Sequence, residues 1–298
     1  MRDIKQGPLH LSFSQLTMLH PNYKYSCPRK WGYRYKLGLA EERSPALAVG
    51  TAMDDAANAF FSMRRDDGLE HLTAGAKAAE VGIASLQQEP PEVWLGVKGD
   101  DPLLSYEALF MQAFAAFLNS EGRAEAALIQ DKHSFSLQLK KRVVEVLGYS
   151  DRIDADGTIV DHKYSGSPRW DSDGNWQQDY LEEKRDQLLV YWLARAAEER
   201  RREAPLQPPL NGTARLVVTY HRLGMQKAQV EVKQIKLNLD ELRDSLLVRL
   251  AEAAEIIAEG RLPLRPGLAC RFCSFLGACR DDQAARGTPF MEAVAVPF

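Results

Sequence analysis

The segment GYSDRIDADGTIVDHKYSG, residues 148–166, constrains the fold of this chain more than any other stretch. Two apolar runs flank the turn sequence DADG, which predicts a β-hairpin. Asp151 is expected to close the first strand. Asp161 and Lys163 on the second strand are two positions apart and therefore share one face, with His162 on the other. The hairpin thus predicts a sheet in which Asp151 lies close to Asp161 and Lys163.

The rest of the chain predicts helices around this sheet. Residues 11–39 predict two short helices, and the run after Gly50 predicts a helix with Asp54 in its first turn. Residues 64–130 are Ala-rich and predict a helical insertion. Later segments predict strands, a helix, strands and a helix, in the ranges 133–154, 158–164, 180–203, 214–223, 228–237 and 239–260. This order is that of an α/β protein with a central mixed sheet flanked by helices.

Composition excludes several classes of protein. The 298 residues are 45% hydrophobic and carry a net charge of −3, which is typical of a globular protein and not of a histone-like, polybasic nucleic-acid binder. No apolar run reaches the roughly 18 residues of a membrane span. The N-terminal residues lack the apolar stretch of a signal peptide. We therefore expect a cytoplasmic protein without membrane contact.

The carboxylates of the hairpin predict a metal site. Two neighbouring carboxylates repel each other unless a cation lies between them, and Mg²⁺ or Mn²⁺ prefers oxygen ligands. A lysine beside such an ion can orient or help deprotonate a water and offset phosphate charge, which is the chemistry of metal-assisted phosphodiester hydrolysis. The alternative is a surface hairpin with a salt bridge, because charged triplets are common.

The four cysteines predict a second metal centre. Cys270, Cys273 and Cys279 form the cluster C-x2-C-x5-C, and Cys27 lies far upstream, directly before Pro28. Four thiolates can hold zinc or an iron–sulphur cluster. Structural zinc usually uses two C-x-x-C pairs, and only one is present here.

These motifs, in this order, resemble the PD-(D/E)XK nuclease superfamily. The segment around residues 12–30 resembles its S-x-S-x-L…C-P-x-K motif, and DQLLVYWLA resembles its Q-L-x-x-Y helix. With the C-terminal cysteines, the resemblance covers residues 10–280. It is closest to the RecB-like iron–sulphur exonucleases, which include CRISPR-associated RecB-like nucleases, phage relatives and the AddB nuclease domain.

The resemblance implies a restriction-endonuclease-like fold and a defined domain plan. Residues 1–298 would form one RecB-like nuclease domain, with residues 64–130 as a helical insertion. Residues 12–39 and 261–280 would form an iron–sulphur subdomain. In it, a 4Fe–4S cluster held by Cys27, Cys270, Cys273 and Cys279 would join the N- and C-terminal segments.

The resemblance also implies roles for the site residues. Asp151, Asp161 and the His162 carbonyl would bind Mg²⁺ or Mn²⁺, and Lys163 would orient the water. Gln187 and Tyr191 would position Lys163 or the DNA backbone.

The chain departs from the family at one position. Asp54 stands where the family has a metal-binding His, and Asp55 is the alternative ligand. Asp54 is either a third ligand, which gives an all-oxygen site, or a helix N-terminal acid stabilised by the dipole.

Basic residues interleaved with aromatic ones predict nucleic-acid contacts. Arg29, Lys30, Arg34 and Lys36 lie in the segment RKWGYRYK, which suits phosphate contact and base stacking. The alternative is an amphipathic helix whose long side chains reach past apolar surface. Trp170 and Trp176 could stack on bases or pack in the core.

Together these observations predict a metal-dependent DNA exonuclease that prefers single-stranded DNA or DNA ends. Its pathway would be phage recombination, repair or CRISPR spacer processing, with an integrase or a single-strand annealing protein as partner, and an oligomer is compatible with this function. Two alternatives remain open. One is a DNA-end-binding adaptor with a weak or inactive site, and the other is a zinc-stabilised interaction module.

Overall fold

The structure is a computed structural model that describes residues 9–95, 97, 101–139, 142–202, 206–237, 239–260, 262–267, 270 and 273–285. The chain divides into two compact units. The first unit draws on residues 1–42, 134–147 and 240–298, and the second on residues 43–133 and 148–239. The domain plan expected from the sequence, including the insertion over residues 64–130, stays a prediction.

The first unit combines elements from both ends of the chain. They are β1 (Leu9–Ser12), α1 (Phe13–Leu19), α2 (Pro28–Trp31), the π-helical turn η1 (Gly32–Lys36), α7 (Leu239–Glu259) and α8 (Leu276–Ala285). Two strands, β2 (Ala126–Leu139) and β3 (Arg142–Asp154), run from one unit into the other. The expected pair of short N-terminal helices is therefore confirmed.

The second unit holds the remaining elements. They are α3 (Pro45–Asp66), α4 (His71–Gln87), the 3-10 turn η2 (Pro91–Trp94), α5 (Pro102–Glu121), β4 (Ile159–Ser165), α6 (Gln178–Arg201), β5 (Thr213–Tyr220) and β6 (Gln229–Lys236). The Ala-rich segment is helical in α4 and α5, as expected, but β2 begins at Ala126 and so occupies the last residues of the expected helical range 64–130. Within the described residues, no helix is both long and apolar enough to cross a membrane.

The strands form a mixed sheet in the order β1-β3-β4-β5-β6, with β2 beside β3. β1 pairs in parallel with residues 144–147 of β3, and β3 pairs antiparallel with β4. β4 and β5 are parallel because α6 crosses over between them, whereas β5 and β6 are antiparallel. The predicted α/β class, with a mixed sheet flanked by helices, is confirmed.

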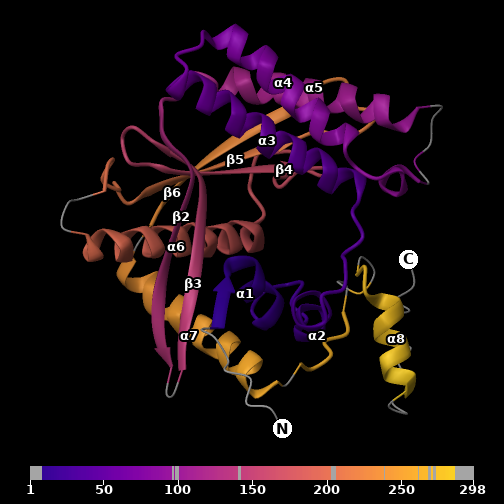
Figure 1. The fold of residues 1–298 in the computed structure, drawn as a ribbon, viewed down its shortest axis with the longest axis vertical. Coiled ribbons are helices and arrows are strands. Elements are labelled where there is room, and N and C mark those ends of the chain that lie inside the picture. The colour runs from indigo at the N-terminus through magenta and orange to yellow at the C-terminus, as the bar shows by residue number, and fades with distance from the viewer. Residues whose placement is uncertain are drawn as a thin grey trace. The chain divides into compact units, whose positions relative to one another are not determined.

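Helices cover both faces of the sheet in the second unit (Figure 1). On one face, Val160 of β4 and Val217 of β5 join the core formed by α3, α4 and α5. On the other face, Ile159 and Leu216 pack with Leu188 of α6. Alternate residues of β4 therefore point to different helices, and the strand is buried on both sides.

The helix that carries Asp54 begins earlier than the sequence analysis expected. Ser44 caps α3, because its hydroxyl accepts a hydrogen bond from the Leu47 amide at 3.3 Å, and Pro45 occupies the first helical position. Asp54 consequently lies in the interior of α3. The interpretation of Asp54 as an acid in the first turn, stabilised by the helix dipole, was wrong.

A group of four charges, three of them on buried residues, lies on the α3–α5 side of the hairpin. Arg152 is fully buried and donates to Asp154 at 2.6 Å and to Glu121 at 2.7 Å. Arg215 of β5 pairs with the same two carboxylates. The Arg152 guanidinium also lies 4.3 Å from the centroid of the Phe61 ring. Two positive and two negative charges compensate each other here, and removal of one member of such a buried set costs about 3–5 kcal/mol.

The turn of the hairpin depends on Gly157. The Gly157 amide donates to the Asp154 carbonyl at 2.9 Å, and the residue has φ +85°. A Cβ at this position would lie 1.9 Å from the carbonyl oxygen of Pro209. Only glycine therefore combines the left-handed backbone with the close passage of the 209–211 segment.

We expect Gly157→Ala to lower the free energy of unfolding by about 3 kcal/mol, from the left-handed φ and the clash together. Gly174 is the matched control, because it has φ +80° and open space around its Cα, so Gly174→Ala carries only the φ penalty of about 1–2 kcal/mol. Urea unfolding followed by circular dichroism measures both variants. Equal losses would show that the contact with Pro209 does not constrain the turn.

Candidate active site

Asp161 and Lys163 of β4 point to the same side of the sheet, as the two-residue period predicted. Asp161 has no exposed surface, and its Oδ1 accepts a hydrogen bond from Lys163 Nζ at 2.8 Å. The same ammonium group donates to the carbonyl of His162 at 3.0 Å. Burial lowers the pKa of Lys163, but the charges of Asp161 and Asp151 outweigh it and hold that pKa well above its usual value. The lysine is therefore a fixed positive charge at neutral pH.

Asp151 lies on β3 directly beside this pair. Its Oδ2 accepts the backbone amide of His162 at 2.7 Å, so the hairpin does bring the two arms together. Desolvation raises the pKa of Asp151 to about 6, and the charge of Lys163 partly offsets that rise. β3 continues to Asp154, so Asp151 does not close the strand as expected; the turn begins only at the DADG sequence.

Asp54 of α3 is the third carboxylate of this group. Desolvation and the charge of Asp151 raise the pKa of Asp54 to about 7, Lys163 lowers it and Asp161 raises it again. The Asp54 side chain is exposed to solvent, which limits desolvation. We therefore attribute the raised pKa mainly to repulsion from the neighbouring acids. Asp55, the alternative ligand, instead accepts a hydrogen bond from Ser85 of α4 at 2.7 Å. The structure therefore directs Asp54, and not Asp55, toward the hairpin carboxylates.

Helix α6 supplies the groups that hold Asp161 from the other side. Gln187 is buried, and its amide donates to Asp161 Oδ1 at 3.2 Å and contacts the Tyr191 hydroxyl, one turn further on. Lys184 donates to the Gln187 carbonyl oxygen at 3.3 Å and thereby fixes which end of the amide faces Asp161. Burial raises the pKa of Tyr191, and the charge of Asp161 adds to that effect. Gln187 thus contacts Asp161, and no hydrogen bond joins it to Lys163 among the described residues.

Gly148 allows α6 to come this close, and the sequence analysis did not assign it a role. A Cβ on Gly148 would lie 2.9 Å from the Ala194 Cβ and 3.1 Å from the Tyr191 Cα. A glycine inside a strand pattern often marks such an approach, so a signal was available.

His162 occupies the opposite face of β4, as predicted, and its ring is buried among aromatic side chains. The ring lies 4.9 Å from Phe117 and stacks at 6.3 Å on Phe61. Burial, with the charge of Arg152, lowers the pKa of His162 well below its usual value. The imidazole is therefore neutral, and only the backbone of His162 contacts the carboxylate group.

The carboxylate group suits a hard divalent cation. Asp161 Oδ2 is buried and accepts no hydrogen bond from any described residue, although Oδ1 of the same group accepts two. The charge of Asp161 raises the pKa of both Asp54 and Asp151, as expected where oxygen ligands for a shared cation lie close together. As they stand, no three His, Cys, Asp or Glu side chains of the described ranges converge into a complete ligand set.

All four cysteines belong to the first unit and are free thiols. As placed among the described residues, no three of them are arranged to hold a metal ion. Cys27 caps α2, with Pro28 at the first helical position, as predicted. Burial raises the pKa of Cys273 and of Cys279, and the charges of Cys27 and Cys270 add to both effects. Cys279 lies in α8.

The segments around the cysteines are joined by polar contacts. Arg29 of α2 pairs with Asp282 of α8 and donates to the Leu262 carbonyl at 3.1 Å. Arg265 donates to the Leu19 carbonyl at 3.1 Å and to the Ser26 hydroxyl at 3.0 Å. Within the first unit, these contacts join α1, α2 and Ser26 to the segment 262–267 and to α8.

Three of the four basic residues expected to contact DNA form ion pairs with acids of the same unit. Arg29 pairs with Asp282, and both Lys30 and Arg34 pair with Glu41. Lys36 lines a cavity of about 440 Å³. The DNA-binding role of this cluster stays a prediction.

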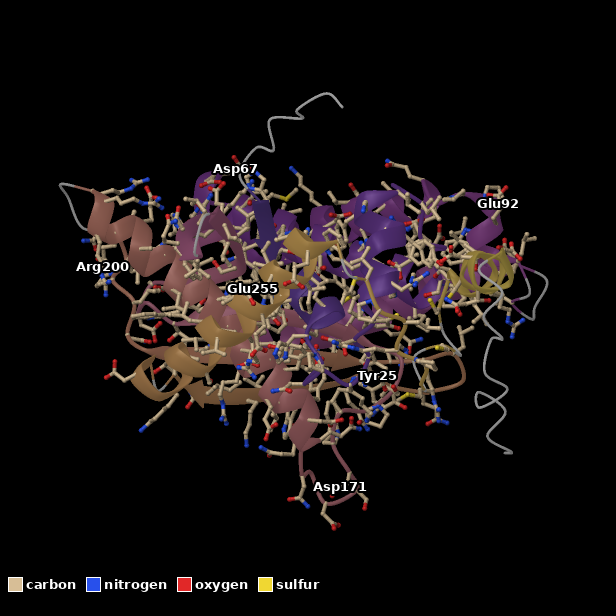
Figure 2. The ribbon with its side chains drawn as sticks, turned by 90° about the horizontal axis from the view of Figure 1, so that it is seen from below. Tyr25, Asp67, Glu92, Asp171, Arg200 and Glu255 are labelled. Carbon is tan, nitrogen blue, oxygen red and sulfur yellow. The ribbon has the colours of Figure 1, made fainter. Side chains whose placement is uncertain are left out.

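The loop between β4 and α6 is closed by its two tryptophans. Trp170 and Trp176 form an isolated antiparallel bridge, and their ring centroids are 5.5 Å apart. Trp170 also packs edge-on against Tyr220 at 6.2 Å, so these rings serve packing. Asp171 stands at the tip of the loop, which projects into solvent (Figure 2). Its carboxylate accepts the amides of Asp173 and Asn175.

Two solved structures align with most of this chain. The crystal structure of a candidate exonuclease from Eubacterium rectale shares 14% identity over 87% of this chain and 85% of that chain, with a TM-score of 0.50. The crystal structure of the protein SSO0001 shares 13% identity over 93% of this chain and 88% of that chain, with a TM-score of 0.43. At 14% identity, the structure from Eubacterium rectale is informative about the fold alone. No curated protein sequence matches this chain.

A family model matches the chain from residue 10 to residue 280, and its description is the PD-(D/E)XK nuclease superfamily. The match spans both units and includes the hairpin, α6 and the cysteines. The expected restriction-endonuclease-like fold is thereby confirmed. With the buried aspartate and its lysine on one strand, the match shows that this chain belongs to the PD-(D/E)XK nuclease superfamily.

Proposed function

We propose that the second unit carries the active site of a metal-dependent deoxyribonuclease that acts as an exonuclease on single strands or DNA ends. The observation that carries the proposal is the state of Asp161. It is fully buried, Lys163 and Gln187 hold one of its oxygens, and the other oxygen has no hydrogen-bond partner among the described residues. A buried carboxylate with an unused oxygen is costly unless a cation binds there.

The ligands that we propose for Mg²⁺ or Mn²⁺ are Asp54, Asp151, Asp161 and the carbonyl of His162. All are oxygen donors, which suits a hard cation. When bound, such an ion would supply Lewis-acid polarisation of a phosphodiester oxygen. The geometry favours Asp54 over Asp55 as the ligand from α3, because Asp55 is engaged by Ser85.

Lys163 would orient the attacking water and stabilise negative charge that develops on the phosphate. Its ammonium group donates to Asp161 and to the His162 carbonyl, so it lies directly beside the ligands that we propose for the ion. Gln187 and Tyr191 are positioning residues in this proposal. Gln187 holds Asp161, and Tyr191 holds the Gln187 amide.

The order of the motifs favours the RecB-like iron–sulphur branch of the superfamily. We propose that Cys27, Cys270, Cys273 and Cys279 hold a 4Fe–4S cluster. Four free thiols form a donor set of the right chemistry, and the charges of Cys27 and Cys270 add to the effect of burial on the pKa of Cys273 and Cys279. Phage recombination, repair and CRISPR spacer processing are the pathways that suit this branch, with an integrase or a single-strand annealing protein as partner.

We expect purified protein to degrade labelled single-stranded DNA in the presence of Mg²⁺ or Mn²⁺. Asp161→Asn and Lys163→Gln should each lower the rate by roughly 100-fold or more, because each removes a charge that acts in the transition state. Gel analysis of end-labelled DNA measures the rate and shows whether cleavage starts from an end.

Asp67→Asn and Lys77→Gln are matched controls for the cleavage assay, because both residues are exposed and lie far along the chain from the hairpin. They should leave the rate unchanged. DNA binding without cleavage would support a DNA-end-binding adaptor instead. Cleavage at the wild-type rate by the Asp161 variant would reject the proposed site.

We expect Mg²⁺ or Mn²⁺ to raise the thermal stability of the chelator-treated protein, by about 2.7 kcal/mol at 100 times the dissociation constant. The gain should be larger at pH 8 than at pH 5, because the ligands bind as carboxylates and the pKa values of Asp54 and Asp151 are raised to about 7 and about 6. Asp54→Asn should reduce the gain, whereas Asp55→Asn should not. Thermal shift assays with and without the ion measure it.

Without metal, the stability of the protein changes with pH in the opposite direction. Carboxyls with raised pKa values stabilise the folded state while protonated, so the metal-free protein should lose stability as pH rises from about 4 to about 7. Asp54→Asn should flatten this decline. Identical metal gains in the Asp54 and Asp55 variants would exclude Asp54 as a ligand.

We expect protein purified without oxygen to contain iron and acid-labile sulphide in equal amounts, about four of each per chain. Cys279→Ser should lower both contents, since it removes one of the four ligands. Elemental analysis decides the point. Zinc in place of iron would identify a zinc-stabilised module.

A further inference from the structure

Two cations from different elements meet at one aromatic ring beside the carboxylate group. Arg169 lies in the loop after β4, and its guanidinium is 5.0 Å from the centroid of the Tyr180 ring. Lys184 lies on α6, and its ammonium is 5.3 Å from the same centroid. Each cation thus lies within 5.3 Å of the centroid of one ring, and cation–π attraction stabilises both positions.

The cations belong to the same neighbourhood as Asp161. Lys184 donates to the Gln187 side chain at 3.3 Å, and the Gln187 amide donates to Asp161 Oδ1 at 3.2 Å. Burial raises the pKa of Tyr180 to about 12, the charge of Lys163 lowers it, and the charge of Asp161 raises it again. Lys184 is therefore connected to Asp161 by two hydrogen bonds through the Gln187 side chain.

Arg169 is held in place by its loop. Its carbonyl accepts the Gln177 amide at 2.9 Å, and the bridge between Trp170 and Trp176 follows directly. Its Nε is buried and has no hydrogen-bond partner in the described part of the chain. A positioned guanidinium suits an anionic ligand.

We propose that Arg169 and Lys184 form a phosphate subsite that binds a backbone phosphodiester of the DNA strand next to the carboxylate group. This inference rests on the proposed nuclease function, and it assigns two residues that bind the DNA substrate of that nuclease. Contacts to phosphates carry no base information, so the subsite accepts any sequence. Glu183 competes for Lys184, because the two pair at 2.8 Å, and a phosphate must replace that contact.

The test measures binding of a labelled single-stranded oligonucleotide in chelator, where cleavage cannot occur, and cleavage with added Mg²⁺ or Mn²⁺. Arg169→Gln and Lys184→Gln should each weaken binding about tenfold at low salt. Each should also reduce the slope of log K against log salt by about 0.7, the value for one lost phosphate contact on a single strand. In cleavage, KM should rise more than kcat falls, and Lys184→Arg should restore KM.

Two further comparisons separate the subsite from a packing role. Arg123→Gln and Lys77→Gln remove exposed cations of the same unit and should leave the salt slope unchanged. Glu183→Gln removes the competing carboxylate and should tighten binding several-fold. Thermal unfolding checks that each variant is folded.

The outcomes distinguish this inference from the nuclease proposal. If the wild type cleaves DNA and the Arg169 and Lys184 variants match their controls, the subsite is wrong and the nuclease stands. If the Lys184 variant loses kcat with KM and salt slope unchanged, Lys184 only orients Gln187. Binding without cleavage would reject the nuclease, while the salt slopes still decide the subsite. A wild type that neither binds nor cleaves overturns both.

Discussion

The burial of the Asp161 charge is the constraint on which the second unit depends. A carboxylate without exposed surface is unstable unless positive charge and hydrogen bonds surround it. Lys163 supplies the charge from the same strand, and Gln187 supplies a hydrogen bond from α6. The crossover helix must therefore pack closely on β4, and Gly148 permits that approach. One carboxylate oxygen still lacks a partner among the described residues.

The other face of the same hairpin carries a complete set of charges. Arg152 and Arg215 balance Glu121 and Asp154, so this group needs no additional ion. Arg152 directly follows Asp151 in β3, and its anchored side chain fixes the backbone that presents Asp151. A neutral His162 fills the aromatic space beside it. The charge-neutral group around Arg152 thus supports the backbone that carries Asp151 and Asp161, whose two negative charges Lys163 balances only in part.

The first unit joins described segments from the N-terminal and C-terminal parts of the chain. The ion pair of Arg29 with Asp282 and the hydrogen bonds of Arg265 join segments more than 230 positions apart. Closing such a long loop has a large entropic cost. A cluster held by the four cysteines would add covalent bonds to these weak contacts, which is the structural role that we propose for it.

The sequence by itself determined the hairpin and the shared side of Asp161 and Lys163, because side-chain direction in a strand follows a local period of two. It also placed the helices and strands in order. It did not determine that α3 begins at Pro45, although Ser44 and Pro45 were a readable capping signal. Only the tertiary structure decided that Gln187 contacts Asp161, that Asp54 and not Asp55 faces the hairpin, and that Glu121 neutralises Arg152. Those contacts join elements distant in sequence, and they depend on how helices pack across a sheet, which no local pattern encodes.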